Sequence, residues 1–162
     1  MYEKTYKVTA KKVGDLEVSV DARGHKVTLD EPVAQGGTDK GMNPVELLLS
    51  SIAACQTVST SIYAESMGIK IDEMSVEVEG DMDSAGFMGY AKFRPGFTNI
   101  RTHVHIKSES DPAMVKQLID LVEIRCPVED TVKNGTEIAK SCLLYTSPSP
   151  RDLSTSRMPS SA

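Results

Sequence analysis

One long apolar stretch constrains this chain more than any other feature. Residues 43 to 67 read NPVELLLSSIAACQTVSTSIYAESM and are followed by Gly68. Pro44 stands where a helix tolerates proline, Asn43 is a suitable cap, and Gly68 is a common helix terminator. The stretch therefore predicts one long helix that begins near Asn43 and ends near Met67.

Cys55 lies near the middle of this predicted helix. Steps of three and four residues from the cysteine reach an apolar stripe formed by Val45, Leu48, Ile52, Val58 and Ile62. We therefore expect the thiol to face the core. Charges are almost absent between Glu46 and Glu65, which predicts burial on more than one side by a sheet or a partner subunit.

A second apolar helical pattern ends at another cysteine. The segment DPAMVKQLIDLVEIRCP, residues 111–127, opens with Pro112 and ends at Cys126 and Pro127. Its apolar face comprises Met114, Val115, Leu118, Leu121 and Val122. Cys55 and Cys126 can therefore meet across one core, although spacing alone leaves open whether they react or only fill space.

The remaining segments predict strands around these helices. Alternating side chains predict an antiparallel meander at residues 2–10, 16–22 and 26–30, and two further strands at 71–82 and 97–109. A short helix is expected at 127–135 and a last strand at 136–141, while 83–96 has no assignable pattern. The length of the chain predicts one domain, at residues 1–141.

Residues 142–162 change composition abruptly and are rich in serine and proline. This composition predicts a disordered tail, and it resembles translated vector or adaptor sequence more than a natural terminus. Cys142 stands at its start, and we expect no role for it.

Charge and composition exclude several classes of function. The net charge is −5 and both signs are mixed along the chain, so no nucleic-acid footprint is indicated. No run reaches the roughly 18 apolar residues of a membrane span, and the charged start lacks a signal-peptide core. A cytoplasmic protein without a membrane partner is expected, in which three cysteines form no structural disulfide framework.

Two other patterns are weaker than they first look. The glycine-rich loop at residues 36–41 precedes a helix, but Lys40 stands on the wrong side for a phosphate-binding loop. His103 and His105 share one strand face without a third ligand at a supporting spacing. We interpret the first as a connecting loop and the second as solvated histidines, so no metal or organic cofactor is expected.

Two motifs resemble those of the OsmC/Ohr family. The first is NPVELLLSSIAAC, in which Cys55 stands twelve positions after Asn43, and the second is RCPVEDTVKNG around Cys126. The upstream segment HKVTLDEPVAQGGTDKGM strengthens the match. The resemblance covers about residues 5 to 140. It implies the α+β fold class and an intertwined homodimer, in which antiparallel sheets from both chains wrap two long central helices.

The resemblance also implies a thiol-dependent peroxidase that reduces small hydrophobic organic hydroperoxides. Cys55 matches the peroxidatic cysteine, whose thiolate attacks the O–O bond and becomes a sulfenic acid. Cys126 matches the resolving cysteine, which condenses with it to a disulfide that a dithiol reductant reopens.

This chemistry requires a cation near Cys55, because a free thiol has a pKa of about 8.5. Cys55 lies roughly 18 Å from the start of its helix at 1.5 Å per residue, too far for the helix dipole to act. Peroxidatic members of the family use an arginine held by a glutamate, and Val45 stands at the position of that glutamate. Arg23 is the first candidate cation, followed by Lys40 and Arg125.

Two other functions are compatible with the same motifs. A non-catalytic dimer that binds a hydrophobic ligand or senses oxidation through a slow Cys55–Cys126 disulfide is favoured by Val45. A purely structural module with inert buried thiols is the third hypothesis.

Overall fold

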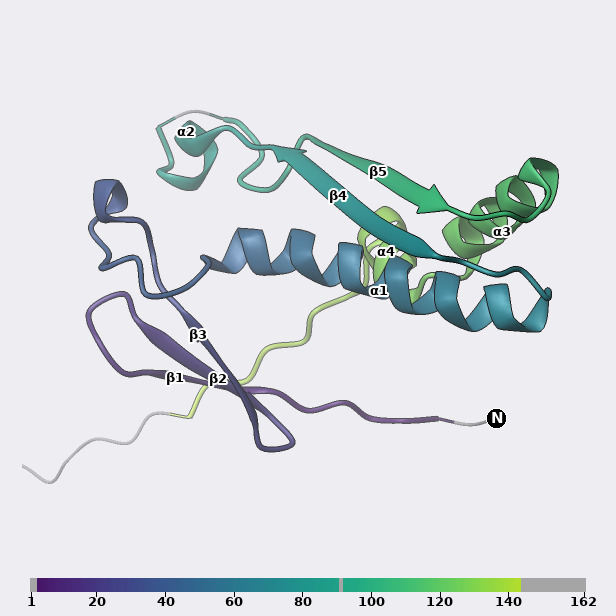
Figure 1. Ribbon diagram of the computed structural model, residues 1–162. Coiled ribbons are helices and arrows are strands. Elements are labelled where there is room, and N and C mark those ends of the chain that lie inside the picture. Colours follow the sequence, from purple (N-terminus) through teal and green to yellow (C-terminus); the bar gives the residue numbers. More distant parts are fainter. Residues whose placement is uncertain (1–2, 91, 144–162) are drawn as a thin grey trace, which may run out of the picture.

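A computed structural model describes residues 3–90 and 92–143 of the chain (Figure 1). Its elements, in order, are β1 (Thr9–Lys12), β2 (Val18–Ala22), β3 (His25–Leu29), the short 3-10 helix η1 (Val33–Gln35), α1 (Pro44–Ser66), β4 (Glu73–Asp81), α2 (Ser84–Phe87), β5 (Asn99–Lys107), α3 (Pro112–Arg125) and α4 (Pro127–Asn134). The α+β class with antiparallel sheets is therefore confirmed.

The first three strands form a separate antiparallel sheet in the order β1-β2-β3. The predicted meander is confirmed, but its first strand begins at Thr9 instead of residue 2. Thr9 pairs with Asp21, and β2 ends one residue later, so residues before Thr9 have no strand opposite them. Arg23 and Gly24, both with positive φ, make the tight turn between β2 and β3.

Helix α1 begins where the sequence predicts. Asn43 caps it by accepting the Glu46 N–H at 2.9 Å, and the Glu46 carboxylate accepts the Asn43 N–H at 2.7 Å. This reciprocal capping box satisfies two backbone donors that the helix leaves free. Glu46 is thus a first-turn capping residue. Gly68 follows the helix with φ +67°, which suits a residue without a side chain.

The apolar face of α1 is only partly covered within one chain. The buried residues are Ile52, Gln56, Ser59, Thr60 and Ala64, which face β4, α3 and α4. Val58 and Ile62, predicted to face the core, are 58% and 60% exposed. The prediction was wrong for them because no described element covers the side of α1 on which they lie, although Ile62 is only about 20° around the helix from Cys55.

By length and composition, α1 is also apolar enough to cross a membrane. Its most apolar 18-residue segment has a mean hydropathy of 1.3, and 17% of that segment is buried. Core helices of water-soluble proteins pass the same test. This differs from the expectation that no segment comes near that threshold.

Strands β4 and β5 form a two-stranded antiparallel ribbon that lies along α1 (Figure 1). Half-buried and exposed residues alternate along β4, so one face of the ribbon packs on the helix. Gly80 allows a close approach there, since a Cβ at this position would lie 2.5 Å from the Phe97 ring. Both strands are confirmed close to their predicted bounds.

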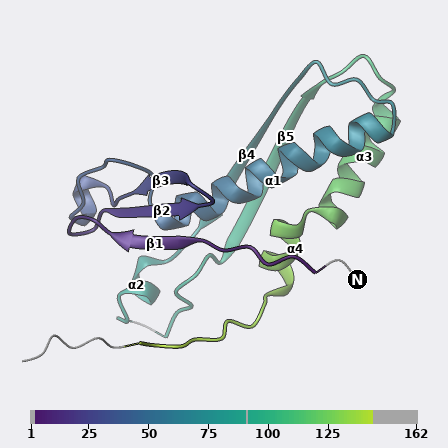
Figure 2. The same cartoon turned by 90° about the horizontal axis from the view of Figure 1, so that it is seen from below.

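The core lies between the C-terminal half of α1 and helix α3. Ala64, Ile69, Leu118 and Val122 form its buried cluster. Viewed from below, α3 and α4 run beside α1, while the β1–β3 sheet lies at the other end of the molecule (Figure 2). Both helices follow their predicted ranges, and the helical run is interrupted between them, just before Pro127, as expected.

Two segments differ from expectation. Residues 136–141 were predicted as a last strand, but the chain there has no regular structure and Ile138 is 79% exposed. No described strand runs beside this segment, and a lone strand has no partner for its hydrogen bonds. The unassigned stretch at 83–96 contains the one-turn helix α2. Most of the predicted tail, residues 144–162, lies outside the described residues.

Candidate functional site

The junction of α3 and α4 fixes Cys126. The residue ends α3, where its N–H donates to Val122 O at 2.8 Å, and it starts α4, where its carbonyl accepts the Asp130 N–H at 2.9 Å. Pro127 occupies the first position of α4, where its missing N–H costs nothing. Backbone bonds on both sides therefore hold Cys126, whose exposed fraction is 0%.

The Cys55 side chain on α1 meets Cys126 at this junction. Cys55 is half-buried, at the border between the covered face of α1 and the open one. Burial raises the pKa of the Cys126 thiol above its ordinary value, and a hydrogen bond to Cys55 raises it further. The backbone N–H groups of Glu129 and Val128 act in the opposite direction.

The arrangement gives the two sulfurs different chemistry. A raised pKa keeps Cys126 protonated near neutral pH, so its S–H can donate to the Cys55 sulfur. Cys55 is the thiol with access to solvent. The two cysteines therefore lie next to each other within a single chain, and Cys142 is exposed.

A polar chain lies next to the thiols and was not singled out from the sequence. Gln56 Nε2 donates to Glu129 Oε2 at 2.8 Å, and Lys133 Nζ lies 3.0 Å from Glu129 Oε1 and 2.9 Å from Glu123. Gln56 directly follows Cys55, and Glu129 lies in the motif after Cys126. The signal in the sequence that could have identified this polar chain was Gln56, a glutamine on the buried face of an otherwise apolar helix.

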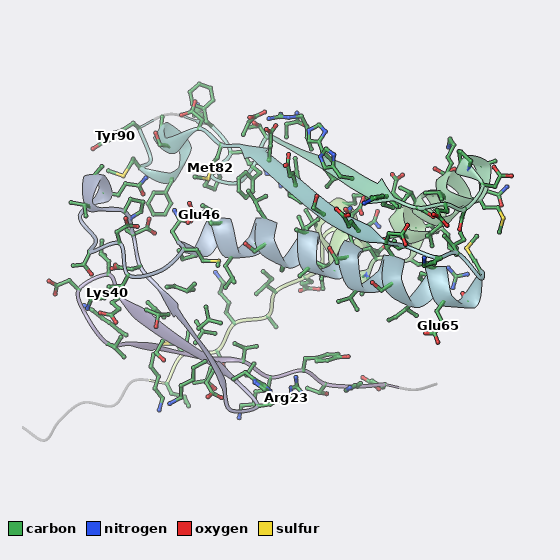
Figure 3. All side chains as sticks on the ribbon, viewed as in Figure 1. Arg23, Lys40, Glu46, Glu65, Met82 and Tyr90 are labelled. Atoms are coloured by element: carbon green, nitrogen blue, oxygen red, sulfur yellow. The ribbon has the colours of Figure 1, made fainter. Side chains whose placement is uncertain are left out.

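The candidate cations do not reach the thiols in one chain. Arg23 is exposed at the end of the β2–β3 hairpin, well apart from Glu46 and Glu65 at the two ends of α1 (Figure 3). Lys40 pairs with Glu17 at 2.6 Å, and Arg125 is exposed on the last turn of α3. Among the described residues, Lys133 is the cation that is linked to the segment beside Cys55, through its ion pair with Glu129 and the hydrogen bond between Glu129 and Gln56.

Two hollows lie along the same side of α1. A groove of about 460 Å³ near the start of the helix is lined by Val45, Leu48, Phe97, Ile100, Val132 and two cationic side chains, Arg94 and Lys133, among others. A smaller cavity of about 170 Å³ is lined by Gln56, Thr60, Glu123 and Glu129 and their neighbours on β5 and α3. The larger groove is mainly apolar, and the smaller cavity is lined by polar and apolar groups in similar measure.

The histidines take no part in this site. His105 Nε2 lies 3.9 Å from Glu77 on the exposed face of the ribbon, and His103 is exposed on the same strand. In residues 3–90 and 92–143, no three histidine, cysteine or carboxylate side chains gather as a metal site would require.

The fold and the site define an α+β protein that holds two adjacent free thiols, one on a long central helix and one at a junction of two helices. Comparison with known proteins extends this description. A family model described as OsmC-like protein matches residues 37–140. The chain belongs to the OsmC-like family.

Its similarity to individual relatives is modest in identity and extensive in coverage. A hydroperoxide reductase of Mycoplasma pneumoniae is 28% identical over 136 residues, covering 84% of this chain and 92% of the relative. One from Mycoplasma genitalium is 26% identical over 134 residues, covering 83% and 90%. The crystal structure of an OsmC-like protein from Mycoplasma pneumoniae superimposes with a TM-score of 0.71 at 28% identity, over 83% of this chain and 91% of that one.

Proposed function

We propose that this protein is a thiol-dependent peroxidase that reduces organic hydroperoxides with Cys55 and Cys126. The observation that carries the proposal is the contact between a half-buried thiol and a fully buried one. A peroxide-related redox role also agrees with the names of the Mycoplasma relatives.

The proposed cycle has three balanced steps. The Cys55 thiolate attacks one oxygen of the O–O bond and becomes a sulfenic acid. The other oxygen leaves with the organic group and takes up one proton to form an alcohol. The Cys126 sulfur then attacks the Cys55 sulfur, and its proton leaves with the sulfenic hydroxyl as water. A dithiol reductant opens the resulting disulfide by exchange and is itself oxidised to a disulfide.

The apolar groove near the start of α1 suits a small hydrophobic hydroperoxide. It is lined by Val45 and Leu48, which lie about three and about two turns before Cys55 on the same helix. Apolar walls with a few charged groups at the edge are typical of small-molecule sites.

The proposal includes a homodimer in a reducing, cytoplasmic compartment. The exposed strip of α1 and the uncovered β1–β3 sheet each need a covering surface, and a second copy of the chain can supply both. Arg23 is then proposed to serve the thiol of the partner subunit, since it lies apart from the thiols of its own chain.

Stopped-flow oxidation tests the function directly. Reduced protein is mixed with cumene hydroperoxide, and the loss of the Cys55 thiol is followed. We expect oxidation at least 100-fold faster than that of free cysteine, because enzymes typically exceed uncatalysed reactions by far larger factors. Cys55→Ser should abolish the reaction, and Cys126→Ser should retain the first step without forming a disulfide.

The proposal is contradicted if Cys55 in the wild-type dimer is oxidised no faster than free cysteine in solution. Hydrogen peroxide at the same concentration serves as the matched substrate control. We expect it to react more slowly, because it gains nothing from an apolar groove.

A second function, a redox sensor that forms the same disulfide slowly, is favoured by one observation. Val45 stands where peroxidatic family members hold their arginine with a glutamate, and it faces the apolar groove. Turnover separates the two functions: a sensor consumes one equivalent of hydroperoxide per chain and stops, even with dithiol reductant present in excess.

A further inference from the structure

One hydrogen bond joins the two segments that carry the thiols. Gln56, the residue after Cys55, donates through Nε2 to Oε2 of Glu129, the third residue after Cys126, at 2.8 Å. Of the described side chains, these are the polar groups that tie the middle of α1 to the first turn of α4. The bond therefore spans the place where the two sulfurs meet.

Both partners of this bond are shielded from water. Gln56 is 5% exposed, and the Glu129 side chain is 14% exposed. Gln56 Oε1 is buried and has no hydrogen-bond partner among the described residues, so Glu129 is what anchors the amide. A hydrogen bond to a charged group under these conditions is among the stronger kinds in proteins.

Glu129 acts on the second thiol as well. Its backbone N–H, together with that of Val128, opposes the rise in the Cys126 pKa at the start of α4, although neither forms a capping hydrogen bond with the sulfur. The main chain of Glu129 thus lies beside Cys126, while its side chain bonds α1. Lys133 pairs with the other Glu129 oxygen at 3.0 Å and limits the rotation of the carboxylate.

We propose that Gln56 and Glu129 are positioning residues for the closure of the Cys55–Cys126 disulfide. They hold the Cys126 sulfur within reach of the oxidised Cys55, so the loss of water from the sulfenic acid and the thiol becomes an intramolecular step with favourable geometry. This inference rests on the two-cysteine mechanism of the proposed function. It concerns the second step of that mechanism and not the attack on the hydroperoxide.

The test compares two alanine variants of adjacent carboxylates in one helical turn. Glu129→Ala removes the link to Gln56, whereas Asp130→Ala removes an exposed carboxylate that bonds only Asn134 at 2.8 Å. Both variants lose one first-turn negative charge from α4, so their effects on the helix dipole match. All proteins carry Cys142→Ser to prevent disulfides between chains.

The readout is the equilibrium constant for Cys55–Cys126 disulfide formation against oxidised dithiothreitol, which needs no peroxide. We expect Glu129→Ala to lower this constant about tenfold, because loss of a charge-assisted hydrogen bond is of that order. Asp130→Ala should stay within about twofold of wild type. Glu129→Gln should recover most of the loss, since an amide oxygen also accepts from Gln56.

Two further measurements separate positioning from general damage. Gln56→Met breaks the same bond from α1 and should lower the constant by a similar factor, which covers the case in which Glu129→Ala fails to fold. In a Cys126→Ser background, Glu129→Ala should leave the rate of Cys55 oxidation by cumene hydroperoxide within about twofold.

Three results overturn the inference. If the wild-type disulfide forms but Glu129→Ala and Asp130→Ala have equal equilibrium constants, only the positioning inference is contradicted. The peroxidase proposal is then left intact. A loss in both the disulfide constant and the Cys55 oxidation rate indicates general damage and also contradicts the positioning inference. Absence of any wild-type disulfide with oxidised dithiothreitol removes this inference together with the two-cysteine mechanism.

Discussion

Cys126 owes its properties to where two helices meet. Full burial raises the pKa of its thiol, and Cys55 adds to this rise through a hydrogen bond. A protonated thiol is a poor first nucleophile and a suitable donor to a neighbouring sulfur. In the proposed mechanism, burial and protonation of Cys126 therefore favour Cys55, the thiol of the pair with access to solvent, for the first attack.

Asp30 organises the loop that leads into α1. It is 2% exposed and accepts from the Thr38 hydroxyl at 2.6 Å and from the backbone N–H groups of Glu31, Thr38 and Lys40. The Thr38 hydroxyl lowers the pKa of Asp30 most, burial opposes this, and the backbone donors lower it further.

We predict that Asp30→Asn lowers stability at pH 7 and that its difference from wild type shrinks in acid. Folding lowers the Asp30 pKa below its ordinary value of 3.8, so the folded state binds this proton less readily than the unfolded chain. The stabilisation is present above that value and is lost as the pH falls through the lower folded pKa. Urea unfolding between pH 3 and pH 7 measures the difference.

Asp15, an exposed carboxylate in the turn between β1 and β2, provides the control, and Asp15→Asn should leave the free energy of unfolding at pH 7 close to that of wild type. A constant difference between Asp30→Asn and wild type across this pH range would contradict the role given to the Asp30 charge.

At the scale of elements, periodicity carried most of the prediction. Alternation identified β4 and β5, and the proline, asparagine and glycine signals placed the ends of α1 and α3 within a residue or two. These signals are local, because a cap or a strand period is set by residues close together in sequence.

The errors came from properties that depend on neighbours. Residues 136–141 alternate like a strand, but the described chain offers no strand to pair with them. Val58 and Ile62 lie on an apolar stripe, but which side of a helix is covered depends on the elements packed around it. The meeting of Cys55 and Cys126 was foreseen from their helices, whereas the Gln56–Glu129 bond needed the relative placement of α1 and α4.

At the scale of the whole molecule, two surfaces are left without a cover by the part of the chain that the structure describes. Val58 and Ile62 on α1 are exposed, as is Val27 on the β1–β3 sheet. Exposed apolar surface that follows one helix marks an interaction site. Cys55 lies at the edge of the α1 strip, so whatever covers this strip also closes the thiol site.

We predict that a second copy of the chain covers the strip. Ile62→Glu should raise the dimer dissociation constant at least about tenfold, because the interface would bury an unpaired charge. Sedimentation equilibrium without detergent measures this constant. Ile124→Glu adds the same charge at an exposed position on α3 and should have little effect.

A monomeric wild-type protein at micromolar concentration would contradict the dimer. A wild-type protein that stays in solution only with detergent or vesicles would point instead to a membrane as the cover of α1.

The most direct measurement of the central claim is intact-mass and peptide analysis after the addition of one equivalent of cumene hydroperoxide to reduced protein carrying Cys142→Ser. The account predicts the loss of two hydrogens per chain and a peptide pair linked through Cys55 and Cys126 of the same chain. A stable gain of oxygen at Cys55 with Cys126 still reduced would contradict it, because two sulfurs in contact should condense.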